Sequence, residues 1–362
     1  MKYFRLPFII LNILTVILQW AAGIFSTLDP NTYGWISLSG YVLPFLAIAN
    51  VLFLALWIFV KKRFILISFI GLVAAYQPIT TYCPLNTSTA GEDMPDSLIT
   101  LLSYNTSNWG DLITSPDKVS TPEEKIKMLT SFFKELNADI VILQESPLSD
   151  AAKPITSMYQ HVDSIKSKSK HGVSISILSR YPIIKKEDLN IETKGNVCGA
   201  FWLNIDGREV IVINAHLEVM HFSMNDRRQF STMVHGDQKD SDSIRSTSHT
   251  LVGKIFNATK TRARQAEHVA QFISMHKDTP IILAGDFNDI PNSYVHKTLL
   301  EAAGNDCYTS TAFGPGYTFK NFGIRVRIDN IMCSSHFTPY NCHIVKDIKT
   351  SDHQPITCKV KL

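Results

Sequence analysis

The sequence lacks the features that identify zinc-ribbon proteins, disulfide-dependent mini-proteins, disordered chains and repeat proteins. Its six cysteines form no CxxC pair, which excludes a zinc-ribbon site and leaves disulfides and buried free thiols both open. Its 362 residues exceed what a disulfide-dependent mini-protein needs, and a hydrophobic content of 45% with a net charge of +3 excludes a disordered chain. It has no internal repeat and no low-complexity tract. The length allows two or three ordinary units, or one large domain with an appendage.

Charge is missing altogether from three long stretches near the N-terminus. Residues 6–25, 35–60 and 64–82 contain no Asp, Glu, Lys or Arg. A helix that crosses the hydrocarbon core needs roughly 20 mainly apolar residues. The third stretch is weaker, because Gln, Pro and Thr dilute its second half. We expect three transmembrane helices within residues 1–83 rather than a cleaved signal peptide, whose apolar core is shorter.

The basic residues of the N-terminal part predict its orientation. Lys2 and Arg5 precede the first stretch, and residues 61–63 (KKR) follow the second. In the loop between these two stretches, Asp29 is the only charged residue. Short loops rich in Lys and Arg stay in the cytoplasm. Three crossings would therefore place the rest of the chain outside the cytoplasm, and two crossings would place it inside.

The remainder of the chain has no basic excess. Of the 35 Lys and Arg residues, five lie in residues 1–83, whereas 31 of the 32 acidic residues lie beyond them. A protein dedicated to binding a nucleic-acid backbone would usually show a basic balance. The composition therefore argues mildly against that class.

Residues 84–97 are rich in Thr, Ser, Pro and Gly and are expected to form a linker. Residues 98–362 alternate apolar runs of strand length with amphipathic stretches, and Asp206-Gly207 between two such runs indicates a hairpin. Thr121, Pro122 and Glu124 predict the capped start of a helix, and a second helix is expected over residues 262–275. The pattern predicts a layered α/β sandwich. Residues 219–261 form a long polar segment that interrupts this alternation, and they are expected to form a mobile insert or a partly helical lobe.

Polar side chains gather where the predicted strands end. Carboxylates, amides and histidines without a cysteine cluster suit a hard cation such as Mg²⁺ or Mn²⁺, and the ends of strands are where α/β sheets place ligands. Each residue alone has a bland interpretation as a turn or capping residue, but the repetition at successive strand ends predicts a shared site. The candidates are Asn105, Glu145, His216, Asp286, Asn288, Asp329, Asp352 and His353.

The ordered motifs around these residues resemble those of the endonuclease/exonuclease/phosphatase superfamily, whose members include nucleases, inositol phosphatases and sphingomyelinases. The resemblance covers about residues 98–362 and implies a four-layer αββα sandwich. Three hydrophobic segments before such a domain also resemble membrane-attached bacterial members, which implies an inner-membrane protein with an extracytoplasmic catalytic domain. The matching segments are 103–105 (SYN), 143–145 (LQE), 177–183 (ILSRYPI), 214–217 (NAHL), 285–288 (GDFN), 327–329 (RID) and 351–353 (SDH).

The resemblance also implies a role for each candidate. Glu145 would be the main ligand of Mg²⁺ or Mn²⁺, with Asn105 and Asp352 nearby. Asp286 would orient or deprotonate the attacking water, and Asn288 would hold that water or a phosphate oxygen. His353, oriented by Asp329, would donate to a phosphate oxygen or to the leaving group, and His216 would bind the phosphate from the other side. Arg264 and Gln265 rank below this set as supporting residues.

The expected protein is thus a membrane-anchored, metal-dependent phosphoesterase acting on a nucleic acid, a lipid phosphate or a sugar phosphate, with no obligate protein partner. A catalytically silent scaffold of the same fold is disfavoured because every expected position carries a competent residue. A receptor or transporter fragment is disfavoured because the apolar stretches contain no charged residue.

Overall fold

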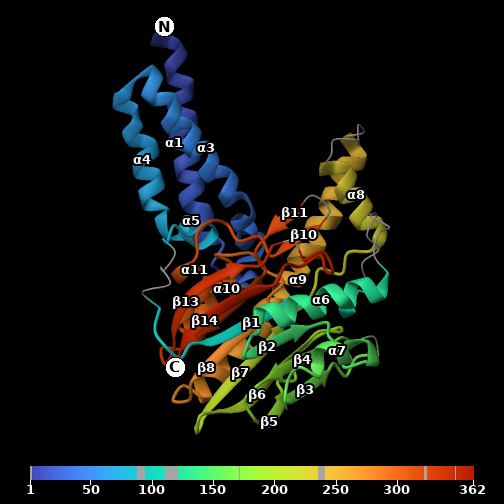
Figure 1. Ribbon diagram of the computed structural model, residues 1–362. Coiled ribbons are helices and arrows are strands. Elements are labelled where there is room, and N and C mark those ends of the chain that lie inside the picture. Colours follow the sequence, from blue (N-terminus) through green and yellow to red (C-terminus); the bar gives the residue numbers. More distant parts are fainter. Residues whose placement is uncertain are drawn as a thin grey trace.

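The computed structural model describes residues 2–87, 94–110, 121–170, 172–234, 241–321, 324–346 and 348–362, and it shows a helical N-terminal part standing on a sandwich of two sheets (Figure 1). Two helical stretches, Arg5–Phe25 and Pro30–Val60, are long and apolar enough to cross a membrane. A third candidate, Lys62–Ala74 with Tyr76–Tyr82, is bent by 65°. The three expected spans are therefore two long helical stretches and one bent pair. Part of the expected linker, residues 88–93, lies outside the described residues.

Buried polar side chains join the N-terminal helices α1 (Lys2–Phe25), α3 (Leu43–Val60) and α4 (Ile65–Ala74). Asn12 donates to Asn50 at 3.2 Å, and Asn50 donates to Gln19 at 3.0 Å. The side-chain oxygen of Asn12, Oδ1, also accepts from Trp57 Nε1 at 2.8 Å and from Ser68 Oγ at 3.1 Å. Such bonds hold apolar helices together where burial against lipid provides no driving force.

The rest of the chain forms two six-stranded sheets. The first has the order β13 (Thr338–Ile344), β14 (Ile356–Lys361), β1 (Ile99–Asn105), β2 (Ile140–Gln144), β4 (Ser174–Ser179) and β3 (His161–Lys166). The second has the order β5 (Ile183–Asp188), β6 (Val197–Ile205), β7 (Arg208–His216), β8 (Ile281–Asp286), β12 (Asp329–Cys333) and β9 (Asn305–Asp306). A small hairpin, β10 (Phe319–Asn321) and β11 (Ile324–Val326), lies beside them.

The sheets pack face to face, and helices cover both outer faces. Aliphatic residues of both sheets, such as Ile142, Ile177 and Val212, fill the central layer. Helix α6 (Pro122–Leu136) covers the first sheet, whereas α9 (Ser241–Met275) and α10 (Tyr294–Ala303) cover the second. This arrangement confirms the predicted four-layer αββα sandwich. Cys307 and Cys333 lie in the central layer with their Sγ atoms 3.6 Å apart, and all six cysteines are free thiols.

Local signals in the sequence explain several element ends. Thr121 and Glu124 form the predicted capping box at the start of α6. Asp206 and Gly207 join β6 to β7 with φ values of 50° and 87°, as the predicted hairpin turn requires. Residues 325–333, a run of strand length, are divided between β11 and β12, because the chain breaks at buried Arg327 and β12 begins two residues later.

The segment expected to be an insert or partly helical lobe, residues 219–261, contains two helices. Helix α8 (Met224–Val234) is followed by α9, which begins at Ser241 and not at Arg262 as the sequence predicts. In the added part of α9, Thr247, Leu251 and Ala258 are buried on one face. The prediction missed this face because a threonine occupies one of its few buried positions. Figure 1 shows α8 and the first half of α9 extending from the sandwich on the same side as the N-terminal helices.

Candidate active site

All eight predicted site residues lie at neighbouring strand ends or in the loops that follow them. Strands β1 and β2 run parallel and end side by side, which brings Asn105 level with Gln144, immediately before Glu145. Strands β7 and β8 are also parallel and end at His216 and Asp286 in the other sheet. The two sheets therefore present their polar side chains at one end of the sandwich.

Asn105 links the carboxylates of the two sheets. Its amide nitrogen donates to Glu145 Oε1 at 3.2 Å and to Asp286 Oδ2 at 3.1 Å, while its oxygen accepts from the backbone N–H of Ser107 at 3.1 Å. The nitrogen, and not the oxygen expected to bind a cation, thus faces Glu145. Asn288 is tied to the same group, since its backbone N–H donates to Asp286 Oδ1 at 2.9 Å and its side chain donates to Leu217 O at 2.9 Å.

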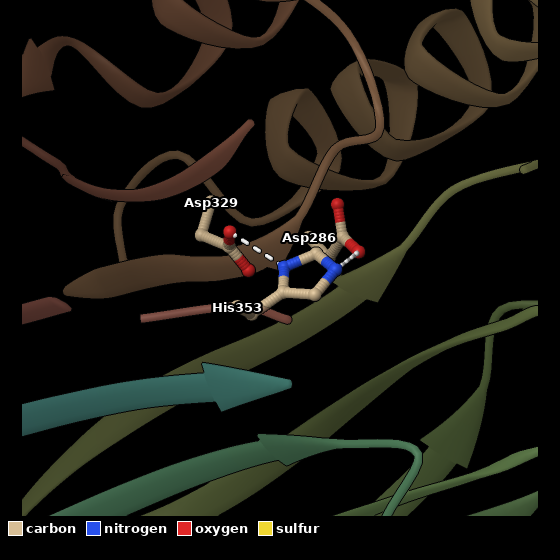
Figure 2. Close-up of side chains that lie close together, drawn as sticks. All are labelled: Asp286, Asp329 and His353. Atoms are coloured by element: carbon tan, nitrogen blue, oxygen red, sulfur yellow. Dashed lines mark hydrogen bonds and ion pairs between the residues drawn. The ribbon is translucent and has the colours of Figure 1, made fainter. Parts of the chain in front are cut away.

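His353 lies between two aspartates, as Figure 2 shows. Its Nδ1 donates to Asp329 Oδ2 at 2.9 Å, and its Nε2 lies 3.6 Å from Asp286 Oδ2. Burial alone would lower the pKa of His353, but the two carboxylates outweigh burial and raise it well above the ordinary value. The ring is therefore a cation at neutral pH. Burial and the Asp329 carboxylate raise the pKa of Asp286 to about 6.

His216 is fully buried in the same group of residues. Its Nε2 lies 3.8 Å from Glu145 Oε1 and 3.7 Å from Asp286 Oδ2, beyond hydrogen-bond distance. Neither ring nitrogen has a hydrogen-bond partner among the described residues. Burial lowers the pKa of His216, so the ring is neutral. A buried polar group without a partner costs free energy and usually indicates a missing ligand or water.

The backbone at the site adopts unusual conformations. Gly285 has a φ of 144°, and a Cβ atom there would lie 2.1 Å from Ala215 O, so only glycine allows β8 to approach β7 this closely. Glu145 and Asn288 have φ values of 48° and 52°, in the left-handed region that non-glycine residues rarely occupy. Such strained residues cluster at functional sites, where the surrounding structure holds them.

Asp352 lies at the edge of the site. Its carboxylate accepts from Asn321 at 3.0 Å, and its charge contributes to raising the pKa of Glu145, which burial raises most. Ser351, the preceding residue, donates to Asn105 O at 2.7 Å and accepts from the backbone of His353. The loop before β14 is therefore fastened to the end of β1.

Two residues between the sheets position this end of the sandwich. Asn214 donates to Leu143 O at 2.9 Å and to Ser176 O at 3.1 Å, and its oxygen accepts from Gln144 at 2.7 Å. All are buried. These bonds join β7 to β2 and β4 directly before His216 and Glu145.

Sequence reasoning missed two arginines. Arg262 is fully buried and donates to Asp289 Oδ2 at 2.9 Å, which holds the loop after β8. Arg227, on α8, lies close enough to Glu145 to lower its pKa against the effect of burial. Of the expected supporting pair, Gln265 accepts from the backbone of Glu218 at 2.8 Å, whereas Arg264 contacts the N-terminal part. Only the structure reveals these partners, because each lies far away in the sequence.

The donors offer two places for a cation. The side chains of Asp286, Asp329 and His353 place ligand atoms within 4.8 Å of one another. Of the set predicted from the sequence, Asn105 bonds to both Glu145 and Asp286, whereas Asp352 accepts from Asn321. Carboxylate and amide oxygens suit a hard divalent cation, and the unpartnered His216 ring nitrogens leave hydrogen-bonding capacity beside two carboxylates.

Comparison with known proteins identifies the family. A model described as the Endonuclease/Exonuclease/phosphatase family matches residues 108–353, which is more than half of the chain. The chain belongs to the endonuclease/exonuclease/phosphatase family. A domain of unknown function (DUF8431) matches residues 4–82, and no curated protein matches the chain. The two matches cover the N-terminal helices and the sandwich separately.

Solved structures of this family share the fold. The D. rerio TDP2 structure with a single-strand DNA product has 17% identity and a TM-score of 0.50, covering 74% of this chain and 100% of that one. A family member from Bacteroides vulgatus gives the same four values. One from Beutenbergia cavernae DSM 12333 has 15% identity and a TM-score of 0.50, covering 73% and 72%. At these sequence identities the similarity shows only that the sandwich has the same fold as these structures.

Proposed function

We propose that this chain is a membrane-anchored, divalent-metal-dependent phosphoesterase. The observation that carries the proposal is the position of His216, which is buried without a partner between the carboxylates of Glu145 and Asp286 and within the same cluster as cationic His353. Two carboxylates, a neutral imidazole and a cationic imidazole around one point suit an anionic phosphoryl group with its cation. Residues 1–83 would be the anchor, 84–97 the linker and 98–362 the catalytic domain.

The residues divide into a cation side and a leaving-group side. Glu145 would hold the cation, Mg²⁺ or Mn²⁺, with Asp352 near it, and Asn105 would join them if its amide turned its oxygen toward Glu145. The cation supplies Lewis-acid polarisation of the phosphoryl group and offsets charge in the transition state. The Asp329–His353 pair forms a separate unit, because a histidine held as a cation by two carboxylates is a proton donor and a poor metal ligand.

The chain's own groups would carry out the proton transfers. Asp286, with its pKa of about 6, is ionised at neutral pH and would orient or deprotonate the attacking water. Asn288, held by Asp286 and Leu217 O, would position that water or a phosphate oxygen. His353 would donate its Nε2 proton to the leaving oxygen, while Asp329 keeps the ring oriented. His216 would contact a phosphoryl oxygen opposite His353.

Contacts with the N-terminal helices support an extracytoplasmic catalytic domain. Tyr82, at the end of α5 (Tyr76–Tyr82), donates to Gly40 O at 2.8 Å, so the bent third segment returns to the side of the loop that contains Asp29. Lys61 and Arg63 lie at the other end of α3. Since Lys- and Arg-rich loops stay in the cytoplasm, the sandwich would face the opposite side, in a bacterium the periplasmic face of the inner membrane.

The test is hydrolysis by the full chain in detergent with Mg²⁺ or Mn²⁺. The substrates are bis-p-nitrophenyl phosphate, p-nitrophenyl phosphate, supercoiled DNA, RNA, inositol phosphates and sphingomyelin. Glu145→Gln and His353→Asn should each abolish turnover, whereas Arg228→Gln, on an exposed position of α8, should retain it. A folded wild-type chain that hydrolyses none of these substrates would support the silent scaffold instead.

A further inference from the structure

We propose that the substrate is a phosphoester carried by a lipid of the membrane leaflet that the catalytic domain faces. The inference rests on the proposed function and narrows its substrate class. It follows from how the N-terminal helices touch the loops that carry the site.

The loop after β8 is bonded directly to the end of α1. Buried Asn292 donates to Gly23 O at 3.0 Å and to Ser26 Oγ at 2.8 Å. Asn288 is four residues earlier in the same loop, and four residues span at most about 14 Å. The site therefore lies within about 14 Å of the end of a helix that is long and apolar enough to cross a membrane.

A second contact joins the other side of the site to the end of the third apolar segment. Arg327 is buried, and its guanidinium donates to Thr81 O at 2.7 Å and to Asn330 Oδ1 at 2.7 Å. Asp329, which orients His353, is two residues away. The ends of the apolar helical segments thus touch both the loop of Asn288 and the segment that leads into Asp329.

A third contact fixes α9 beside the helices. Phe256 stacks on Trp35 with ring centroids 4.1 Å apart, and Arg264 donates to Asn31 Oδ1 at 3.2 Å. Helix α8, which precedes α9 in the chain, packs against it, and the charge of Arg227 on α8 acts to lower the pKa of Glu145. The N-terminal helices and the α8–α9 pair extend from the sandwich on the same side (Figure 1). A membrane crossed by these helices would therefore lie on that side of the sandwich.

Exposed apolar side chains continue this surface. Phe313 is 74% exposed and Leu85 is 59% exposed, and the two residues form an isolated strand bridge directly after the last N-terminal helix. From Phe313 the chain leads to Phe319, whose ring packs against His353 at 5.1 Å between centroids. Apolar groups at the ends of membrane helices enter the headgroup region, which adds about 5–8 Å to each side of the hydrocarbon core.

The distances favour a substrate that the bilayer itself presents. A lipid phosphate at headgroup level needs little displacement to reach a site so close to the helix ends. A nucleic acid would have to approach along the bilayer without the strongly basic surface that usually attracts it, since residues 98–362 carry nearly balanced charge, with 30 basic and 28 acidic residues.

The experiment uses the full chain in dioleoylphosphatidylcholine nanodiscs. Phosphatidate and phosphatidylglycerol are each offered as dioleoyl lipids within the disc and as their deacylated, water-soluble glycerol esters at the same bulk concentration. Bis-p-nitrophenyl phosphate and single-stranded DNA complete the panel. Phe313→Ser tests the exposed apolar surface, and Ile184→Ser, 58% exposed on β5, is its matched control.

We expect at least tenfold faster turnover of one bilayer lipid than of its deacylated form. Phe313→Ser should lower lipid turnover at least threefold without changing hydrolysis of bis-p-nitrophenyl phosphate, and Ile184→Ser should change neither. Hydrolysis of bis-p-nitrophenyl phosphate without any preference for a bilayer lipid, or faster hydrolysis of DNA, would overturn the inference and leave the proposed function standing. Loss of all hydrolysis would overturn the proposed function itself.

Discussion

The amide network of helices α1, α3 and α4 and the candidate active site both contain buried polar side chains, but they differ in whether those side chains have hydrogen-bond partners. Among the helices, Asn12, Gln19 and Asn50 bond to one another and to neighbours, so each amide finds partners. In the site, both ring nitrogens of His216 and Asp329 Oδ1 have no hydrogen-bond partner in the part of the chain that the structure describes. All of these residues are at most 1% exposed.

The difference distinguishes polar groups that hold structure from polar groups kept for a ligand. A network in which every polar group has a hydrogen-bond partner stabilises one arrangement of helices. Polar atoms without a partner can bond to a ligand, but their burial lowers the free energy of unfolding. The comparison therefore predicts that substitutions in the two regions affect different properties.

The largest expected effect is on catalysis, from His216→Leu. Removing the unpartnered imidazole should lower kcat/KM for bis-p-nitrophenyl phosphate by about 10²–10³-fold, as for other groups that stabilise transition-state charge. Because no protein hydrogen bond is lost, the melting temperature should stay the same or rise. Steady-state kinetics and thermal denaturation of the same preparation measure both. A large drop in melting temperature would show that His216 is structural and would break the comparison.

Asp329→Asn should change the pH dependence as well as the rate. The Asp329 carboxylate helps to raise the pKa of His353, and the proposed mechanism needs the protonated ring. Losing that charge lowers the pKa, so the alkaline limb of the profile should move to lower pH, and the rate near neutrality should fall by about 10²-fold. A profile of kcat/KM from pH 5 to 10 measures the shift. An unmoved alkaline limb would contradict the assignment of His353 as the acid.

Arg227→Gln should have a smaller effect that sharpens the boundary of the site. Its charge acts on Glu145 from α8, so its loss should raise KM by about tenfold, which corresponds to about 1.4 kcal/mol of binding free energy. Arg228→Gln is the control on the same helix, because Arg228 is exposed. Equal KM values for the two variants would show that α8 does not contribute to substrate binding at the site.

Asn50→Leu should have the smallest effect, and on stability alone. It leaves the Asn12 amide nitrogen and the Gln19 amide oxygen each without its Asn50 partner, which should cost about 0.6–2 kcal/mol, the range for such bonds between helices in a membrane. Unfolding in mixed detergent measures this loss, and hydrolysis of bis-p-nitrophenyl phosphate at low temperature should remain unchanged. A catalytic loss equal to that of His216→Leu would show that the two regions are not separate.

The sequence predicts the sandwich because its central strands are continuous apolar runs. It does not predict β3, β5 or β13, since these strands lie at or near sheet edges and carry polar residues such as Lys185 and Lys186. The start of α9 is also missed, because polar residues interrupt the apolar face that it presents to the protein.

The candidate site is predictable to the extent that its chemistry lies at strand ends. Asn105, Glu145, His216 and Asp286 meet because parallel strands end together, which a sequence pattern can indicate. The contacts that hold the surrounding loops are not predictable, because they join residues remote in the sequence. Asn292 and Gly23, for example, are 269 positions apart.

The central claim is that Glu145 holds the cation while Asp329 and His353 form a separate acid pair. Manganese binding to the full chain, followed by electron paramagnetic resonance, tests it most directly. We expect one bound Mn²⁺ that Mg²⁺ displaces, lost in Glu145→Gln and retained in Asp329→Asn. No binding to the wild-type chain, or binding that survives Glu145→Gln and disappears in Asp329→Asn, would contradict the account.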